Sequence, residues 1–312
     1  MIGLIDEHDP VLADEVNAAL DLRAGGYYVD ATFGRGGHTA RILEALGGEG
    51  RLLALDRDPQ AIEAGRQRFP HELRLTLQHA PFSELGTLVP AHAQGHPCAG
   101  VLFDLGVSSP QLDEPARGFS FRADGPLDMR MDPTRGEPVA AWLARAGIDE
   151  MREVIATLGE ERFARRVAQA IAGARERAPL TRTAQLAELV GRAVRTREPG
   201  KNPATRTFQA LRMFINDELG QLEAGLAAAF EVLAPGGRLA VISFHSLEDR
   251  TVKRFMARHS NVDPALARLP VVPESARPRM RLIGRKLRPT EGEVARNPRA
   301  RSALLRVAEK LA

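Results

Sequence analysis

The chain has 312 residues, of which 44% are hydrophobic and 27% charged, as in an ordinary globular protein with a large core. Its single cysteine, Cys98, excludes an internal disulfide and any cysteine-rich zinc site. No apolar run approaches the roughly 20 residues that a membrane span requires, and residues 1–10 lack the basic start of a secretory signal. We therefore expect a cytoplasmic protein that does not enter membranes.

Charge is unevenly distributed along the chain. The net charge is only +3, but residues 268–312 carry 12 Lys or Arg against 4 Asp or Glu. A basic tail on a slightly acidic body favours a polyanionic partner. Arginines that merely solvate the surface of an arginine-rich protein would give the same count.

A glycine-rich turn follows the first predicted strand, at 27–32. The turn Gly34-Arg35-Gly36-Gly37 leads into a helix that begins at His38, and the next apolar strand, at 51–55, is followed by Asp56. A strand, a glycine turn, a helix and a second strand with a terminal acid are typical of a site for a nucleotide-like ligand. A plain tight connection is the alternative.

The glycine spacing favours one such ligand. A dinucleotide fingerprint would need glycine at position 39, where the chain has Thr39. The pattern fits better as the S-adenosylmethionine (SAM) form of the motif, with Asp30 first and Thr32 in the place of the first glycine. In that register Asp30 is expected to face the methionyl ammonium. A nicotinamide-dependent dehydrogenase on the same fold remains the alternative.

Strands and helices alternate over the first 110 residues, which predicts an α/β fold with a parallel sheet. After a helix at 59–69, further strands are expected at 73–77 and 101–104. Ligands of such sheets bind beyond the carboxyl ends of the strands. We therefore expect one crevice to gather Asp30, Asp56, Phe82 and Asp104.

The second half of the chain begins with a different pattern. Residues 105–136 lack clear periodicity, and a loop of this length is usually functional. Helical periodicity over about 137–205 predicts an inserted all-α domain. A single helix is then expected from Phe208 to Leu233, because apolar residues recur there every three or four positions.

The C-terminal part is predicted to complete the sheet. A fifth strand is expected at 238–244, followed by a helix whose capping box begins at Ser246. Two final strands are expected within 281–288 and 302–308. The arginines of this tail that we expect to contact a polyanionic partner are Arg279, Arg281, Arg285 and Arg288.

Long sequence motifs identify a family. They are Asp104–Asp113, Arg117–Met131 and Ser243–Arg250, and they resemble those of the bacterial 16S ribosomal RNA (cytosine-N4)-methyltransferases, the RsmH/MraW family. The resemblance runs from about His8 to Asp249 and onward into the basic tail. It implies an enzyme that methylates N4 of a specific cytidine in 16S rRNA of the small ribosomal subunit.

The resemblance also implies an architecture and a cofactor site. The fold would be a Rossmann-like class I SAM-dependent methyltransferase sheet, formed by residues 1–136 and 206–312, with 137–205 as an inserted substrate-recognition domain. The positions that match the SAM contacts of the family are Gly36, Gly37, His38, Asp56, Phe82, Asp104 and Gln111.

The chemistry needs a group that accepts hydrogens from N4. The candidates for catalysis are Asp128 and His245, although Asp128 could instead hold its loop through Arg130 or Arg117 and His245 could lie beside a helix cap. No metal is expected. A non-enzymatic RNA-binding assembly factor with a degenerate cofactor pocket is a further alternative, and the sequence leaves a homodimer open.

Overall fold

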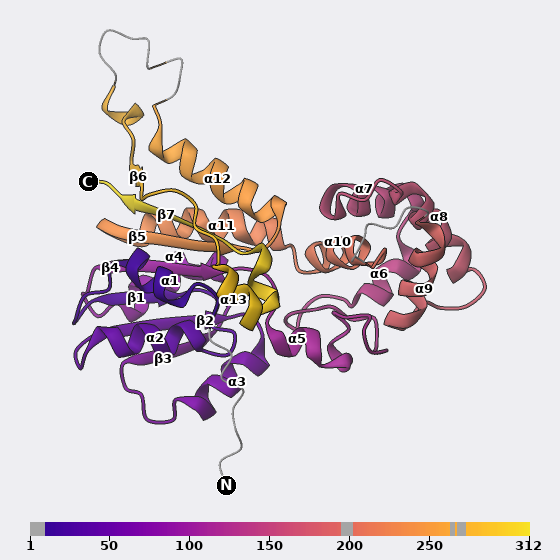
Figure 1. The fold of residues 1–312 in the computed structure, drawn as a ribbon, viewed down its shortest axis with the longest axis horizontal. Coiled ribbons are helices and arrows are strands. Elements are labelled where there is room, and N and C mark those ends of the chain that lie inside the picture. The colour runs from indigo at the N-terminus through magenta and orange to yellow at the C-terminus, as the bar shows by residue number, and fades with distance from the viewer. Residues whose placement is uncertain (1–9, 195–201, 263–265, 267–272) are drawn as a thin grey trace. The chain divides into compact units, whose positions relative to one another are not determined.

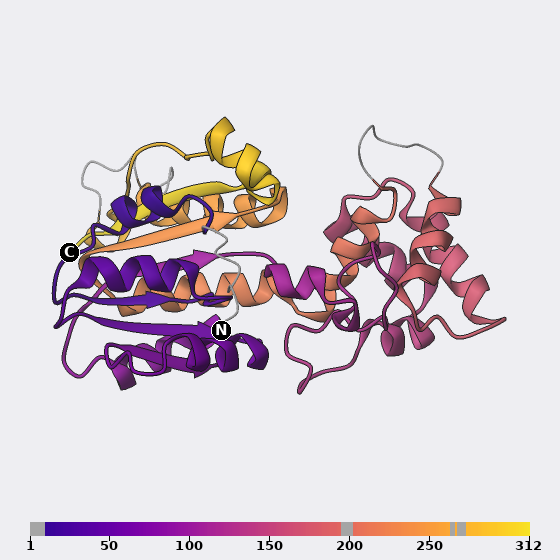
Figure 2. The ribbon, with the colours of Figure 1, turned by 60° about the horizontal axis from the view of Figure 1, so that its bottom comes forward.

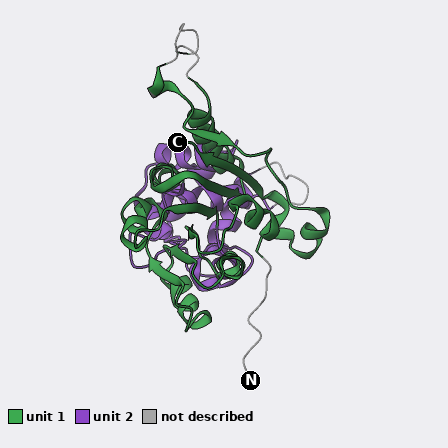
Figure 3. Cartoon of the chain, turned by 90° about the vertical axis from the view of Figure 1, so that its left-hand side faces the viewer, with its two compact units in different colours: residues 1–106, 219–312 green, residues 107–218 purple. Residues whose placement is uncertain are grey.

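The computed structural model describes residues 10–194, 202–262, 266 and 273–312. The chain divides into two compact units, residues 1–106 with 219–312, and residues 107–218 (Figure 3). The segment 107–136, which lacks periodicity, therefore belongs to the second unit together with the helices that follow it.

The first unit is built on a seven-stranded sheet with the order β3-β2-β1-β4-β5-β7-β6 (Figure 1). Strands β1 to β5 are parallel, whereas β7 is antiparallel to both of its neighbours. The predicted α/β, Rossmann-like fold class is confirmed. The strands in chain order are Tyr27–Asp30, Arg51–Asp56, Leu75–His79, Cys98–Asp104, Leu233–Ser243, Met280–Leu282 and Leu304–Lys310.

Helices cover both faces of this sheet (Figure 2). Both faces of the sheet are apolar. Alternate residues of the central strands point to opposite faces, so that Val29 and Val101 belong to one core and Tyr28 and Leu102 to the other. Helices α4 (Leu85–His92), α11 (Glu218–Val232) and α12 (Ser246–Ser260) add apolar residues to the first core. The other helical segments of the unit are α1 (Ala13–Leu20), α2 (Gly37–Leu46), α3 (Pro59–Arg68), α13 (Glu291–Arg296), η1 (Phe82–Glu84), η4 (Glu274–Ala276) and η5 (Pro298–Ser302).

The second unit is helical and has a core of its own. Its helices are α5 (Ser109–Asp113), η2 (Pro115–Arg117), α6 (Val139–Arg145), α7 (Ile148–Gly159), α8 (Ala164–Arg175), α9 (Thr183–Ala193) and α10 (Thr205–Ile215). Trp142 is buried in this core, where its indole N–H donates to Glu150 Oε1 at 3.0 Å. Among the residues that the structure describes, no helix combines the length and the apolar character needed to cross a membrane.

The predicted helix from Phe208 to Leu233 was wrong, because the structure divides it into α10 and α11. The Asn216 side chain accepts from Met131 N–H and donates to the carbonyl of Met129, both at 2.8 Å. Asp217 then takes a left-handed conformation with a φ of 46°. The apolar stripe continues across this break and conceals it.

Several other boundaries also differ from their predictions, and the fifth strand begins at Leu233 instead of residue 238. The third strand begins at Leu75 instead of residue 73, and Leu73 is 96% exposed. The alternation of apolar residues is the same from either start, so only the pairing with β2 decides the boundary. At α12 the N-cap is His245, paired with Glu248, where we expected Ser246 to begin the capping box.

Candidate active site

The strand order brings three acids to one edge of the sheet. β1 lies between β2 and β4, and all three strands are parallel, so Asp30, Asp56 and Asp104 lie at the carboxyl edge. Repulsion from Asp30 helps to raise the pKa of each of the other two. The edge therefore combines negative charge with burial, which is a common arrangement at functional sites.

Asp30 braces the glycine-rich turn from inside. Its carboxylate accepts from Thr39 Oγ1 at 2.7 Å and from Thr32 N–H at 3.1 Å, and the residue is 1% exposed. Burial raises the pKa of this carboxyl to about 6. The expectation that Asp30 faces a ligand's ammonium group stays a prediction, and its bonds to Thr32 and Thr39 give this carboxylate a role in holding the turn.

Two threonines that stand in glycine places of the fingerprint have structural roles that sequence reasoning missed. The buried hydroxyl of Thr39 bonds Asp30, and Thr32 Oγ1 accepts from Asp104 N–H at 2.6 Å. The second bond ties the turn to the end of β4. The sequence could have indicated these roles, because each threonine stands at a position where the fingerprint normally has glycine.

The turn itself leaves backbone N–H groups available at the edge. Gly34 and Gly36 have φ values of 56° and 74°, which side chains rarely allow, and a Cβ at Gly36 would lie 2.8 Å from the Phe33 ring. α2 begins directly after Gly36 with no side-chain cap. Its first N–H groups and its dipole can therefore receive an anionic group, such as a carboxylate, near Gly37 and His38.

Asp56 accepts one backbone hydrogen bond on each carboxylate oxygen, from Gly34 at 2.7 Å and from Asp58 at 2.8 Å. Burial raises the pKa of this carboxyl to about 6. Each carboxylate oxygen has two acceptor sites. Asp56 can therefore still receive the two hydroxyl groups of a ribose.

The buried pair of His38 and Asp104 is the most unusual feature of the edge. His38 Nε2 lies 3.6 Å from Asp104 Oδ2, and neither ring nitrogen of His38 nor Oδ1 of Asp104 has a hydrogen-bond partner among the described residues. Burial lowers the pKa of His38 to about 4 and raises the pKa of Asp104 to about 8. At neutral pH the imidazole is uncharged, and the carboxyl retains its proton most of the time.

Phe82 lies at the margin of the core, after β3. Its ring packs edge-to-face on Phe103, with 5.3 Å between the centroids, and a Cβ at Gly225 would lie 2.6 Å from it. The side chain is only partly buried. These contacts fix the ring in place and leave part of it accessible.

Gln111 and Asp128 both belong to the second unit. Gln111 is buried, and its Oε1 accepts from Ser108 N–H at 3.0 Å, which caps α5. The Asp128 carboxylate accepts hydrogen bonds from Nε and Nη2 of Arg130, at 2.7 and 2.8 Å. Burial raises the pKa of the Asp128 carboxyl, but the bonds from Arg130 outweigh that effect and hold the pKa below its ordinary value.

His245 follows β5 and caps α12. Its Nδ1 accepts from Glu248 N–H at 3.4 Å. Its Nε2 lies 3.0 Å from Glu248 Oε1, although without the alignment of a hydrogen bond. The ring therefore uses one acceptor position for the cap, and Nε2 carries the hydrogen when the ring is neutral.

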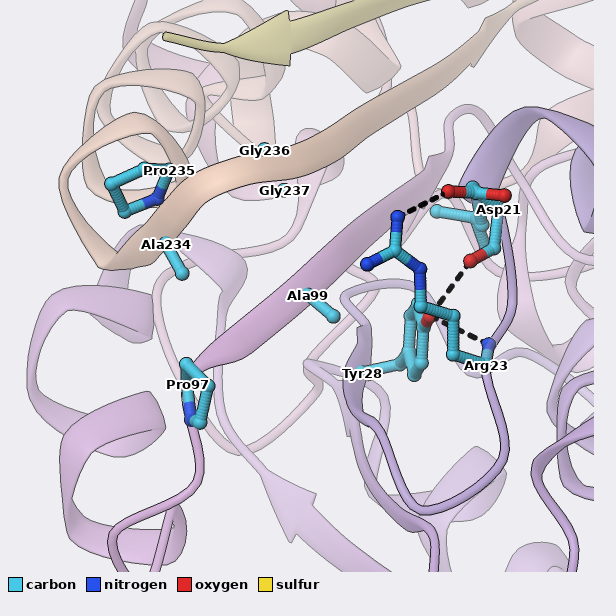
Figure 4. Close-up of a pocket in the computed structure, with 10 residues that line it drawn as sticks. Asp21, Arg23, Tyr28, Pro97, Ala99, Ala234, Pro235, Gly236 and Gly237 are labelled. Carbon is cyan, nitrogen blue, oxygen red and sulfur yellow. Dashed lines mark hydrogen bonds and ion pairs between the residues drawn. The ribbon is translucent and has the colours of Figure 1, made fainter. Parts of the chain in front are cut away.

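A small pocket lies at the opposite, amino edge of the sheet (Figure 4). It has a volume of about 150 Å³ and is lined mainly by apolar groups of the strand starts, among them Pro97, Ala99 and Pro235. The Tyr28 hydroxyl beside it is fully engaged, because it accepts from Arg23 N–H and donates to the Asp21 carbonyl, both at 3.0 Å. The groups expected to bind the cofactor do not line this pocket.

Comparison with known proteins gives the family. A model described as the MraW methylase family matches residues 6–311. The chain belongs to this family. It is 57% identical to ribosomal RNA small subunit methyltransferase H of Aromatoleum aromaticum over 97% of both chains. It is 55% identical to the protein of the same name from Halorhodospira halophila, over 97% of this chain and 94% of the relative.

Among solved structures, an rRNA methylase from Streptococcus thermophilus is a more distant match, with 13% identity and a TM-score of 0.42. The match covers 96% of this chain and 94% of that one. The family assignment does not depend on it. Family membership confirms the expectation of a SAM-dependent methyltransferase, and nothing supports a dehydrogenase or a non-catalytic factor.

Proposed function

We propose that this protein transfers a methyl group from SAM to N4 of a cytidine in 16S rRNA of the small ribosomal subunit. Identity over nearly the whole length with ribosomal RNA small subunit methyltransferase H supports the substrate class. The resemblance of the long motifs supports N4 as the acceptor atom. The observation that carries the reaction is the buried, unpartnered pair of His38 and Asp104.

The residues at the carboxyl edge fit SAM. Asp56 has acceptor sites left for the ribose hydroxyls, and the uncapped start of α2 suits the methionyl carboxylate. Asp104 offers an unpartnered carboxylate oxygen to positive charge. The exposed part of Phe82 suits an adenine ring. By resemblance, Gly36, Gly37, His38 and Gln111 complete the set.

When bound, SAM supplies an electrophilic methyl group on a sulfonium. The N4 lone pair of cytosine is delocalised into the ring, so the protein must hold N4 in line with the methyl carbon. A bond forms between N4 and that carbon as the carbon–sulfur bond breaks, and N4 then loses a proton. The base must leave its stack to reach such a site.

Asp104 is the best-supported acceptor for the N4 hydrogens. In the ligand-free protein its pKa is about 8, and a bound sulfonium lowers that pKa, so that the carboxylate is ionised at working pH and can accept a hydrogen. Two side-chain hydrogen bonds join Asp128 to Arg130. The acceptor nitrogen of His245 is already used in the cap of α12. We assign those two candidates to positioning the amine and its loop.

The test uses tritiated SAM and small ribosomal subunits from a strain that lacks this methyltransferase. The purified protein should place about one methyl per subunit, and nucleoside analysis should find it as N4-methylcytidine. Label on another atom, or none despite folded protein that binds SAM, would contradict the proposal.

The remaining expectations concern the setting of the reaction. We place the protein in the cytoplasm, where small subunits assemble, and fractionation of cells would test this location. The homodimer left open by the sequence would be tested by light scattering at micromolar concentration.

A further inference from the structure

One group of basic side chains near the C-terminal strands is engaged in contacts within the protein. Arg238 and Arg281 both pair with Glu309, at 2.9 and 2.6 Å. The Arg279 guanidinium lies 4.4 Å from the Phe230 ring centroid and pairs with Glu231 at 3.8 Å. These arginines lie toward the amino edge of the sheet, since Arg238 pairs with Gly100, near the start of β4. Two of the tail arginines expected to contact RNA are therefore used for internal contacts.

The second group consists of Lys253, Lys286 and Arg288, which we call the basic ridge. All three are exposed, and none has an ion-pair or hydrogen-bond partner among the described residues. Free, exposed cations of this kind retain their full hydration and their capacity to bind an anion.

The ridge lies toward the carboxyl edge, where the methyl donor is proposed to bind. Leu287 exchanges two backbone hydrogen bonds of 3.0 Å with Leu305, and Leu305 pairs in turn with Ile242. Ile242 is also the partner of Asp104 in β4. The short segment of Lys286 and Arg288 therefore runs at the level of the strand ends.

Strand alternation turns the ridge toward α12. Leu305 faces the core on the α1 and α2 side, and the adjacent Arg306 points the other way, toward α12, where it bonds Asp249 at 2.7 and 3.1 Å. Lys286 and Arg288 flank Leu287 and so take the same side as Arg306. Lys253 lies one turn after Asp249 on α12.

Electrostatics agree with this placement. The bond from Arg306 is the main reason that the pKa of Asp249 is lowered, and Lys286 and Lys253 lower it further. Both lysines therefore lie close to Asp249. Because Arg306 already neutralises that carboxylate, the lysines leave a net positive surface.

We propose that the basic ridge binds the sugar-phosphate backbone of the rRNA beside the flipped cytidine. This inference rests on the proposed function, and it names the part of the first unit that holds the substrate. RNA is favoured over other polyanions because the ridge shares the sheet edge with the methyl-transfer site. Contacts to phosphates fix the register of a strand without reading its sequence.

The experiment compares two triple variants with equal loss of charge. The ridge variant is Lys253→Ala, Lys286→Ala and Arg288→Ala. The control variant removes three exposed arginines that are not part of the ridge: Arg23→Ala, Arg66→Ala and Arg258→Ala. Binding to small subunits that lack the methyl group is measured at several salt concentrations, together with kcat, KM and SAM affinity.

For the ridge variant, we expect the slope of log K against log salt to become shallower by roughly 2, because each lost phosphate contact removes about 0.7–0.9. KM for subunits should rise, while SAM affinity and kcat stay at the wild-type level. A ridge variant that matches the control in slope and KM would overturn the inference. Failure of the proposed function would be different, because the wild-type protein itself would then leave subunits unmethylated.

Discussion

The two edges of the sheet treat their polar groups in opposite ways. At the amino edge, polar side chains near the pocket contact one another: the Tyr28 hydroxyl makes two hydrogen bonds, and Arg238 and Arg281 both form ion pairs with Glu309. At the carboxyl edge, buried atoms of His38 and Asp104 have no hydrogen-bond partner among the described residues.

The presence or absence of these contacts distinguishes polar groups that stabilise the fold from polar groups that can bind a ligand. A buried polar group without a partner costs about 1–3 kcal/mol, so a fold gains nothing by itself from holding several together. A ligand that supplies the missing partners recovers that cost as binding energy. The carboxyl edge is therefore where substitutions should change activity, and the amino edge is where they should change little.

The largest effect is expected from Asp104→Asn. The amide keeps the shape of the side chain but cannot take a proton, so kcat should fall by about 10²–10⁴-fold. Single-turnover methylation of small subunits measures this. Thermal unfolding should show that the variant is at least as stable as the wild type, because a buried acid with a raised pKa has been removed. A kcat within threefold of wild type would remove Asp104 from the mechanism.

The second effect is on the pH dependence of SAM binding. The ligand-free pKa of Asp104 is about 8, and its carboxyl must lose a proton before it can face a cation. SAM affinity should therefore rise about tenfold per pH unit between pH 6.5 and 8, and then level off. Titration calorimetry in two buffers should find close to one proton released at pH 7.

Asp104→Asn is the control for this pH dependence, and it should remove the slope. An unchanged slope in that variant would assign the proton to another group. The same raised pKa makes the free energy of unfolding of the ligand-free protein fall as pH rises from about 4 to about 8, because the folded state holds the proton more tightly than the unfolded chain.

A smaller effect is expected where the carboxyl edge is braced from inside. Asp30→Ala leaves the buried Thr39 hydroxyl and the Thr32 amide without their acceptor, and should lower the free energy of unfolding by about 1–3 kcal/mol. Urea denaturation measures the change. Thr39→Ala and the double variant complete a mutant cycle, and a coupling energy near zero would show that this bond does not hold the turn.

The smallest effect is expected at the amino edge. Arg23→Ala breaks an ion pair whose side chains are 73% and 51% exposed, and solvent screens such a pair so that it contributes little to stability. Methylation rate and SAM affinity should be unchanged. A loss of SAM affinity in this variant would contradict our placement of SAM at the carboxyl edge.

Much of the fold could be predicted from local pattern. Apolar runs that end in Asp56 and Asp104 marked β2 and β4, and the glycine spacing marked the turn before α2. The break at Asn216 could not be predicted, because its partners lie more than eighty residues away, in the segment around Met129 and Met131.

The candidate site was predicted unevenly for the same reason. Strand-end acids can be recognised in the sequence, because parallel strands share an edge. The pairing of His38 with Asp104 depends on how the fold brings the start of α2 close to the end of β4, which no local pattern encodes. The bond between Asp128 and Arg130 spans only two residues, and the sequence already allowed it as an alternative to catalysis.

A crystal structure of the protein soaked with SAM and cytidine tests the central claim most directly. The account predicts the ribose hydroxyls on Asp56, the sulfonium beside Asp104, and the cytosine amine within hydrogen-bond distance of that carboxylate. Density for the donor in the amino-edge pocket beside Tyr28, or a carboxyl edge without ligand at saturating concentration, would contradict it.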